Sequence, residues 1–416
     1  MDSNILVFNC GSSSLKYKVY KVRNADQLDQ IASGIAHRVG VKSQEASFIE
    51  NHYHGNTEKL VQPLDTHRKA ASLCVRCLHN AGIVIDAVGH RFVHGGTIFK
   101  ESTMITKERM KDLRDCLPLA PIHNPNSMSV IEMCVEELPG LPQYVCCDTT
   151  FHTSIPAKAY CYALPQSIVE QFGFRKIGYH GLSYQFVTEA AARFLKTPKE
   201  GLKMIICHLG TGGSSAAAID SGKSVETSMG HSSLTGLIMN TRVGDLDPMI
   251  PIELIQSGYT MDEITQLLYK ESGLIGISGY SSDIRDLIAH HADTGDERSG
   301  LAVDMYIHRL RLYIGGYLAI LGGADALIFT DDVGIQEWQI REMACKNMEW
   351  AGIDLDDWVN RRASQSEIAL LNTANSKVRI LSVPNDEEII IATEGLKLLG
   401  ADLNTESLET RQRCNG

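Results

Sequence analysis

The sequence predicts an α/β fold with two domains. Apolar runs of strand length at residues 4–10 and 204–209 each end in a turn of small residues, and each is followed by a returning apolar run. Stretches with a helical pattern lie between these units. A chain of 416 residues is also long enough for two domains. Because the strand–turn–strand unit recurs roughly two hundred residues along the chain, the sequence indicates a duplicated domain.

The returning strands are read from their patterns. Residues 15–19 alternate between apolar residues and lysines, which predicts a half-buried strand after the serine-rich turn "GSSS". In the second unit, "AAAI" at 216–219 returns, and "DSGK" predicts a hairpin that leads into another strand. The stretch "ALIFTDDVG", residues 326–334, predicts a further strand that ends in a turn.

Helical patterns fill the space between the strands. Residues 260–272, "TMDEITQLLYKES", begin with a threonine cap and have a glutamate three residues later. Residues 299–321 predict a long apolar helix, which we expect Gly315 and Gly316 to break. The polar stretch at 291–300 predicts a loop.

The composition is that of an ordinary globular protein, with 44% hydrophobic and 21% charged residues. No apolar run approaches the roughly 18 residues of a membrane span. The opening "MDSNILVFNCGSSS" lacks the basic start of a signal peptide, so we expect a cytosolic protein. A net charge of −11 argues against a general nucleic-acid binder, but not against a small anionic substrate bound by a few arginines.

The eleven cysteines have no framework spacing and predict reduced thiols. Cys74 and Cys77 form one CxxC pair, which cannot close a four-ligand zinc site. Buried thiols that pack as small hydrophobic side chains are therefore the favoured interpretation.

The turn "NCGSSSLK", which runs from Asn9 to Lys16, is the first candidate site. Its glycine frees the backbone, its serines offer hydroxyl donors and its lysine adds a cation, a combination that suits a phosphate oxygen or a metal-bound water. An ordinary serine-rich hairpin is the alternative, and no GxxxxGK[ST] loop is present. The second candidate is Arg91 in "GHRFVHGG", where either a bidentate contact with an anion or a structural ion pair is possible.

Further candidates follow apolar runs or lie beside glycines. They are Arg242 in "RVGDLDP" next to Asp245 and Asp247, Asp148 in "CCDTTFH", His180 in "GYHGLS", and the pair Glu387 and Glu388 in "PNDEEIII". A structural histidine and a solvated helix start or strand edge are the alternatives for the last two. Together the arginines, lysine, histidine and carboxylates suit phosphoryl transfer, which needs charge neutralisation, a divalent metal and positioning. The residues alone therefore predict a phosphate-handling α/β enzyme.

Ten ordered blocks give the chain a family resemblance. They are "ILVFNCGSSSLKYKV", "GHRFVHGG", "APIHNP", "CDTTFH", "GYHGLS", "HLGTGGSS", "TSMG", "TRVGDLDP", "SGLIGISGYSSDIRDL" and "PNDEE". Between residues 5 and 388 the chain thus resembles the acetate kinase family. The resemblance implies a homodimer with the duplicated ribonuclease-H-like core shared by actin and sugar kinases. It implies an N-terminal domain of residues 1–151 plus 386–416 and a C-terminal domain of residues 152–385.

The resemblance also implies roles for individual residues. Asn9 and Glu387 would help to hold Mg²⁺ or Mn²⁺. Arg91 and Arg242 would bind the carboxylate and the phosphoryl group, His180 would stabilise that group and Asp148 would complete the catalytic site. An apolar pocket for the acetate methyl group would include Val93, Ile122 and Tyr179. The phosphate-binding residues would be Ser12, Ser14, Lys16, His208, Gly210, Thr211 and Gly212.

Departures from the family pattern cluster on the expected nucleotide side. Thr211 replaces the asparagine of "HLGNG", and Asp331, Asp332 and Ile335 replace the two glycines and the acid of "FTGGIGE". Other changes are Asn240 in place of glycine and Ser233 in place of a proline that borders the acceptor pocket, whereas Asp283 and Arg285, which normally face adenine, are kept.

The two aspartates predict a blocked adenosine pocket. Each adds a side chain where backbone should approach the nucleotide, and each adds negative charge beside a polyanion. At about 5 Å and an effective dielectric constant near 20, two like charges repel by roughly 3 kcal/mol. We therefore expect the pyrophosphate-linked branch of the family, with orthophosphate or pyrophosphate in place of ADP or ATP. The alternatives are an ordinary ATP-dependent acetate or propionate kinase and a catalytically inactive ligand-binding relative.

Overall fold

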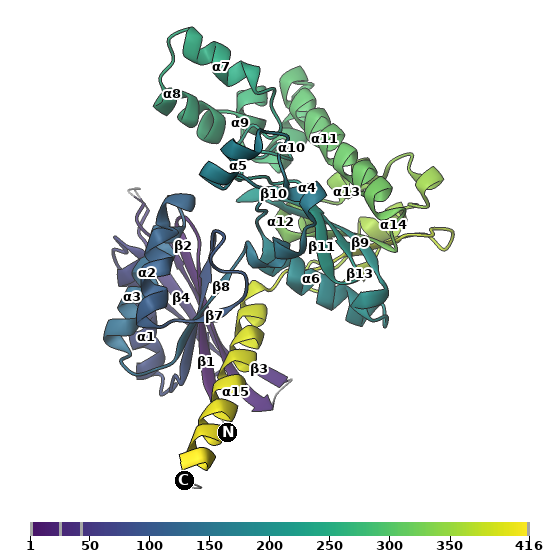
Figure 1. The fold of residues 1–416 in the computed structure, drawn as a ribbon. Coiled ribbons are helices and arrows are strands. Elements are labelled where there is room, and N and C mark those ends of the chain that lie inside the picture. The colour runs from purple at the N-terminus through teal and green to yellow at the C-terminus, as the bar shows by residue number, and fades with distance from the viewer. Residues whose placement is uncertain (1–2, 25–26, 42–44, 414–416) are drawn as a thin grey trace. The chain divides into compact units, whose positions relative to one another are not determined.

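A computed structural model describes residues 3–24, 27–41 and 45–413, with the backbone alone for residues 401–413 (Figure 1). The chain divides into two compact units. The first unit contains residues 1–150 and 386–416, and the second contains residues 151–385. Among the described residues, none of the helices is both long enough and apolar enough to cross a bilayer.

The described residues of the first unit form an eight-stranded sheet with the strand order β5-β4-β3-β2-β1-β6-β8-β7. The strands are β1 (Asn4–Cys10), β2 (Ser14–Asn24), β3 (Gln27–His37), β4 (Phe48–Tyr53), β5 (Asn56–Val61), β6 (Ala87–Phe92), β7 (Thr103–Met104) and β8 (Gln143–Cys147). Strand β1 pairs with β2 in antiparallel register and with β6 in parallel register. The predicted strand–turn–strand opening is therefore confirmed.

Helices cover both faces of this sheet (Figure 1). They are α1 (His67–Asn80), α2 (Lys107–Asp115), α3 (Asn124–Glu137) and α15 (Glu387–Arg413), with a short 3₁₀ turn at Leu117–Leu119. Leu6 and Phe8 of β1 pack in one core with residues of α1 and α3. Side chains alternate along a strand, so Asn9 points to the opposite face. There α15 approaches so closely that a Cβ at Gly89 of β6 would lie 2.8 Å from a methyl carbon of Ile391.

The second unit contains a six-stranded sheet within its described part, with the order β11-β10-β9-β12-β14-β13. The strands are β9 (Lys203–Gly210), β10 (Gly213–Asp220), β11 (Lys223–Thr227), β12 (Ala326–Thr330), β13 (Ala369–Leu370) and β14 (Arg379–Ser382). The order β11-β10-β9-β12-β14 repeats β3-β2-β1-β6-β8 of the first unit, with the same directions at the central strands. The predicted duplicated ribonuclease-H-like α/β architecture is confirmed.

The two faces of the second sheet have different helices. Cys207 and Leu209 of β9 belong to a core with residues of α11 and α13, whereas Met204 and Ile206 pack with residues of α6. Alternation therefore directs His208 toward α6. The helices of this unit are α4 (Ala157–Tyr160), α5 (Gln166–Phe172), α6 (Gly181–Phe194), α7 (Met249–Gln256), α8 (Met261–Gln266), α9 (Gly273–Ser278), α10 (Ile284–Thr294), α11 (Glu297–Leu321), α12 (Asp331–Gln336), α13 (Trp338–Cys345) and α14 (Asp357–Asn360), with short turns at Lys199–Gly201, Leu267–Glu271 and Glu349–Ala351 and, at the boundary of the two units, Thr150–Ser154.

Three local expectations were wrong. The helix α11 continues through Gly315 and Gly316, because it buries residues such as Leu310 and Ile314, and that packing outweighs a cost of about 1 kcal/mol for each glycine. The expected loop at 291–300 shrinks to two residues between α10 and α11. The turn expected after residue 330 is instead the first turn of α12.

Other local expectations hold. Thr260 caps α8, and its hydroxyl and the Glu263 carboxylate form the reciprocal bonds of a capping box. The "DSGK" hairpin connects β10 to β11, with Ser221 and Gly222 at positive φ as a tight two-residue turn requires. All cysteines within the described residues are free thiols, and Cys74 is buried while Cys77 is partly buried.

We predict that the buried histidine His152 makes the second unit sensitive to acid. Burial lowers the pKa of His152 from 6.5 to about 4, while its nitrogens bond Ser224 Oγ and the Tyr179 carbonyl. Between pH 7 and pH 5 the unfolded chain binds a proton at this position and the folded chain does not, so stability falls as the pH falls. The contribution that is lost is roughly 2 kcal/mol.

The measurement is urea unfolding at pH 7 and pH 5. The His152→Gln variant should lose less free energy of unfolding between these pH values than the unmodified chain does. Replacement of the exposed His79 by glutamine is the matched control for the substitution itself. An unchanged pH dependence in His152→Gln would contradict the assignment.

Candidate active site

Arg91 is the centre of the polar cluster in the first unit. It lies near the end of β6, and Asp148 directly follows β8, the parallel neighbour of β6. Arg91 donates from Nε to Asp148 Oδ1 at 2.9 Å and from Nη2 to Asp148 Oδ2 at 2.6 Å. Both carboxylate oxygens are thus engaged by one planar guanidinium, the bidentate geometry that orients an arginine most firmly. The structural ion pair considered for Arg91 is present.

Asn9, at the end of β1, joins Arg91 to the start of α15. Its Oδ1 accepts from Arg91 Nη1 at 2.9 Å. Its Nδ2 lies 3.1 Å from Glu387 Oε2 and 2.7 Å from Glu388 Oε1. The two glutamates begin a helix, as one interpretation of the sequence had it. However, Glu388 is only 6% exposed, so the solvated position expected for the pair is wrong for that residue.

The cluster carries more negative than positive charge. Lys18 Nζ lies 2.8 Å from Asp386 Oδ2 and 3.4 Å from Glu388 Oε2. Counted formally, four carboxylates (Asp148, Asp386, Glu387 and Glu388) face two cations (Lys18 and Arg91). Burial disfavours the charge of Arg91, but the nearby carboxylates of Asp148, Glu387 and Glu388 outweigh it and raise the pKa of Arg91 above its ordinary value.

The serine-rich turn connects β1 to β2 beside this cluster. The amide of Gly11 donates to the Ser14 carbonyl at 2.9 Å, and a Cβ at Gly11 would lie 2.7 Å from Ser14 Oγ. Ser12 is exposed, and Lys16, also exposed, pairs with Asn9 across the two strands. Residues directly opposite each other in a sheet share a face, so Lys16 extends from the same face as Asn9.

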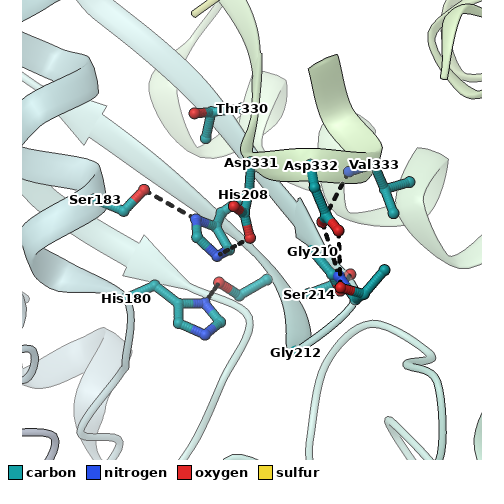
Figure 2. A network of polar contacts seen from close by, with 12 residues as sticks. His180, Ser183, His208, Gly210, Gly212, Ser214, Thr330, Asp331, Asp332 and Val333 are labelled. Carbon is teal, nitrogen blue, oxygen red and sulfur yellow. Dashed lines mark hydrogen bonds and ion pairs between the residues drawn. The ribbon is translucent and has the colours of Figure 1, made fainter. Parts of the chain in front are cut away.

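The second unit has its own polar network, which Figure 2 shows. His180 occupies the N-cap position of α6 in a left-handed backbone conformation with φ of 60°. Its Nδ1 lies 2.8 Å from Ser215 Oγ of β10, and its ring stacks on His208 of β9 with 4.1 Å between the centroids. Ser183 Oγ lies 2.9 Å from His208 Nδ1. The network therefore joins the start of α6 to the ends of two adjacent strands.

Asp331 reaches this network from the start of α12. Its Oδ2 lies 3.1 Å from His208 Nε2 (Figure 2). A Cβ placed on Gly210 would lie 2.0 Å from the same oxygen, so only glycine at 210 leaves room for the carboxylate. The backbone of Asp331 has φ of 67°, a region where glycine is the usual residue and where aspartate is tolerated better than most others.

Asp332 bonds the turn between β9 and β10. Its Oδ1 accepts from the Thr211 amide at 2.9 Å, and its Oδ2 accepts from Thr211 Oγ1 at 2.8 Å. Oδ1 also accepts from the Val333 amide at 2.9 Å. The carboxylate thus engages a backbone donor of a glycine-rich turn, the type of group that would otherwise face a phosphate oxygen.

Arg242 lies on another side of the same turn. Its Nη2 donates to the Gly212 carbonyl at 3.3 Å, and Nη1 contacts Met239 Sδ at 3.7 Å. A Cβ at Gly213 would lie 3.2 Å from Arg242 Nη1 and 3.8 Å from His180 Cε1, so arginine and histidine converge there. Burial lowers the pKa of Arg242 from its ordinary value. Its sequence neighbour Asp245 is bonded elsewhere, to Arg309 and Tyr313.

The residues expected on the nucleotide side lie around α12 and α10. Asp283 accepts from Arg285 at 2.9 Å and 2.6 Å, and Arg285 Nη1 donates to Gln336 Oε1 at 3.0 Å. Ile335 is buried. Asn240 and Ser233 lie, half-buried, in the segments before Arg242.

The residues expected to form the acceptor pocket come from both units. Val93, after β6, is buried, whereas Ile122, which precedes α3, is 46% exposed. Both belong to the first unit. Tyr179 belongs to the second unit, where it is buried directly before His180 and its hydroxyl donates to the His231 carbonyl at 3.2 Å.

Several contributors were missed by the sequence reasoning. Lys18 contacts the candidate Glu388 and also pairs with Asp386, while Ser183 and Ser215 contact His208 and His180. The buried Arg341 donates to the Gly334 and Ile335 carbonyls near the end of α12. Burial lowers the pKa of Arg341 to about 10. The alternating pattern of lysines in β2 could have pointed to Lys18. Nothing in the sequence around Arg341, a lone arginine in a helical stretch, indicates that it contacts the end of α12.

Comparison with known proteins points to one family. The sequence model of the Acetokinase family matches residues 4–393 of this chain. An acetate kinase of Halothermothrix orenii is 40% identical over 405 residues, which cover 95% of this chain and 99% of the relative. The crystal structure of an acetate kinase from Entamoeba histolytica is 43% identical with a TM-score of 0.85, and covers 95% of this chain and 99% of that one. A propionate kinase from Francisella tularensis is 32% identical with a TM-score of 0.85, at 94% and 98% coverage.

We predict that Gly210→Ala destabilises the second unit because of Asp331. The new methyl group displaces the Asp331 carboxylate from His208, at a cost of about 1–3 kcal/mol in the free energy of unfolding. Gly212→Ala is the matched control, because a Cβ at Gly212 meets nothing within 4 Å. Combining Gly210→Ala with Asp331→Gly should recover most of the loss. Urea unfolding of the unmodified chain, Gly210→Ala, Asp331→Gly and the double variant measures this coupling. Additive effects of the two changes would contradict the contact.

Proposed function

The chain belongs to the acetokinase family, and we propose that it is a pyrophosphate-linked acetate kinase. In this reaction the phosphoryl group of acetyl phosphate passes to orthophosphate, which yields acetate and pyrophosphate. The bond between phosphorus and the acetate oxygen breaks as the bond to an orthophosphate oxygen forms, so no further reactant is needed. In the reverse direction pyrophosphate is the donor and acetate the acceptor.

The position of two carboxylates supports this proposal. Asp331 and Asp332 engage His208 Nε2 and both donors of Thr211, which are groups that the family resemblance assigns to phosphate. A nucleotide on this side of the turn would have to displace the carboxylates and would bring its own negative charge toward them. Pyrophosphate has no nucleoside and does not need this side of the turn. The enzyme would therefore select pyrophosphate over ATP because the carboxylates exclude the nucleotide.

Arg242 and His180 are the groups of the second unit that we assign to the phosphoryl group in transfer. They converge on Gly213, beyond the part of the turn that Asp332 engages. Arg91 is the corresponding group of the first unit. Fixed cations of this kind stabilise charge in the transition state without reorganising during the reaction.

Acetate needs no general base. A carboxylic acid has a pKa of roughly 4–5, so at neutral pH acetate is already the nucleophile. Both oxygens of Asp148 are held by Arg91, which fits a residue that positions the guanidinium rather than one that accepts a proton. The harder step is to bring a carboxylate toward an anionic phosphate, because the two groups repel each other. The positive charges of the arginines reduce this repulsion.

The cluster at the start of α15 fits a divalent cation. Its donors are carboxylate and amide oxygens, which Mg²⁺ and Mn²⁺ prefer, and it carries an excess of formal negative charge. The described residues contain no group of three or more His, Cys, Asp or Glu side chains arranged to hold a metal. We therefore infer that Asn9 and Glu387 would hold Mg²⁺ largely through its waters, as is usual for this ion. When bound, the ion would neutralise phosphate charge.

Acetate is the acceptor that we propose, in an apolar pocket to which Val93, Ile122 and Tyr179 would contribute. One methylene group in such a pocket changes the free energy by only about 1–3 kcal/mol, so propionate should be a slower substrate rather than a non-substrate. The homodimer and the cytosolic location stay predictions from the sequence.

An ordinary ATP-dependent acetate kinase is the second candidate. The observation that favours it is the intact pair of Asp283 and Arg285, which the family resemblance places at adenine. In this alternative α12 would move when ATP binds. A catalytically inactive relative is less consistent with the chain, which keeps Arg91, Arg242 and His180.

We predict that Arg242→Ala lowers kcat by about 10²–10³, because it removes a fixed cation from the transition state. The free energy of unfolding should change little, since Arg242 donates only to a carbonyl and a thioether in the contacts described above. Arg91→Ala should reduce both activity and stability, because it leaves the carboxylate of Asp148, which is 1% exposed, without its bidentate partner.

Colorimetric detection of acetyl phosphate as its hydroxamate gives kcat, and urea unfolding gives the stability of each variant. Arg242→Lys keeps the charge and separates its effect from that of the guanidinium shape. If Arg242→Ala retains more than about half of the activity, Arg242 does not have the proposed role.

We predict that the unmodified enzyme uses orthophosphate in preference to ADP when acetyl phosphate is the phosphoryl donor. The comparison is kcat/KM for orthophosphate against kcat/KM for ADP. Replacing Asp331 and Asp332 together by glycine should raise kcat/KM for ADP, although only in part, because Thr211 and Asn240 also differ from the family pattern. A preference of tenfold or more for ADP in the unmodified enzyme would identify an ordinary ATP-dependent kinase.

A further inference from the structure

We propose that Asp331 is a positioning residue for the transfer reaction itself, because it fixes the imidazole of His208 and, through the stacked rings, supports that of His180. This inference rests on the proposed function in one respect, the assignment of His180 to the phosphoryl group. It is independent of whether the phosphoryl acceptor is orthophosphate or ADP. The aspartate would thus do more than close the nucleotide side of the turn.

The first step is the two-point attachment of His208. Asp331 Oδ2 lies 3.1 Å from Nε2, and Ser183 Oγ lies 2.9 Å from Nδ1. An ionised carboxylate only accepts hydrogen bonds, so Nε2 must carry a proton. In the neutral ring, Nδ1 then accepts from the Ser183 hydroxyl. The carboxylate therefore selects one tautomer as well as one ring orientation, as the carboxylate partners of functional histidines generally do.

The second step is the contact between the two imidazoles. The rings of His180 and His208 stack with 4.1 Å between centroids and 26° between planes. His180 is held at Nδ1 by Ser215 Oγ, and Ser215 Oγ is bonded in turn to the Tyr184 hydroxyl at 2.6 Å. The face of His180 thus packs on a ring whose own position is set by Asp331, and its Cε1 edge approaches Gly213 beside Arg242.

The third step is the firm attachment of Asp331. The residue adopts a φ of 67°, which is costly for a side chain other than glycine, although aspartate tolerates it comparatively well. Behind it, the buried Arg341 donates to the Gly334 and Ile335 carbonyls at 2.8 Å and 2.6 Å, which fixes the far end of α12. A carboxylate on so constrained a helix start can orient its histidine partner, whereas one on a loose loop would not.

The test compares Asp331→Asn with Asp332→Asn. Both replace a carboxylate by an amide in the first turn of α12, and asparagine also tolerates the backbone conformation of residue 331. Only Asp331 contacts His208, while Asp332 contacts Thr211. The direct readout is the tautomer of His208 from imidazole ¹⁵N chemical shifts of histidine-labelled full-length protein. The His208 signals are identified by their loss in His208→Gln.

We expect Asp331→Asn to change the ¹⁵N shifts of His208 toward protonation at Nδ1, because the amide group can donate to Nε2. We expect Asp332→Asn to leave these shifts unchanged. With acetyl phosphate as donor, kcat of Asp331→Asn should fall by about tenfold or more with orthophosphate and with ADP alike, the range seen when a functional histidine loses its carboxylate partner. Glu342→Gln is the activity control, because Glu342 lies in α13 and pairs with Arg361 rather than with any residue of the network.

Asp331→Gly provides a second variant in case the asparagine variant does not fold, since glycine suits the backbone at 331. It should also change the His208 shifts. Unchanged His208 shifts in both variants would overturn the proposal, and so would an unchanged kcat with both acceptors. The ratio of kcat/KM for orthophosphate to that for ADP separately reports acceptor selectivity, so a failure of the pyrophosphate linkage is distinguishable from a failure of this inference.

Discussion

The rest of the candidate site depends on one constraint. A buried polar side chain near the end of strand β1, and another near the end of strand β9, must each find hydrogen-bond partners. In both units that strand carries a polar side chain near its end, Asn9 in the first and His208 in the second, close to a turn of small residues. Such groups are costly to bury without partners. In both units carboxylates from the first turn of a helix supply the partners, Glu387 and Glu388 in one and Asp331 in the other.

The two solutions lead to different chemistry. In the first unit the carboxylates are balanced in part by Arg91 and Lys18, and the remaining formal charge is negative, which suits a divalent cation. In the second unit the carboxylates engage the donors of a glycine-rich turn, which reduces what that turn can offer to a phosphate. The duplicated fold therefore carries one polar cluster with an excess of formal negative charge and one turn whose donors are already engaged by carboxylates.

The acidic pair on α12 also shows why a change from glycine to aspartate affects more than one position. The carboxylate of Asp331 fits only because residue 210 is glycine, and the helix that carries it is fixed by the buried Arg341. Thr211 contributes a hydroxyl that bonds Asp332, where the family pattern has asparagine. These residues form one connected set, so their effects on stability and on specificity should not be additive.

The sequence by itself determined the α/β class, the duplication, the family and most of the residues that line the two clusters, because periodicity, small-residue turns and ordered motifs are local signals. It could not decide that α11 runs through two glycines, that Glu388 is buried, or that Arg341 holds α12, since each depends on packing between distant segments. Which groups the two aspartates contact was likewise decided only by the tertiary structure. Their charge is visible in the sequence, but their partners, His208 and Thr211, lie more than a hundred residues away and are brought to them by the parallel pairing of β12 with β9.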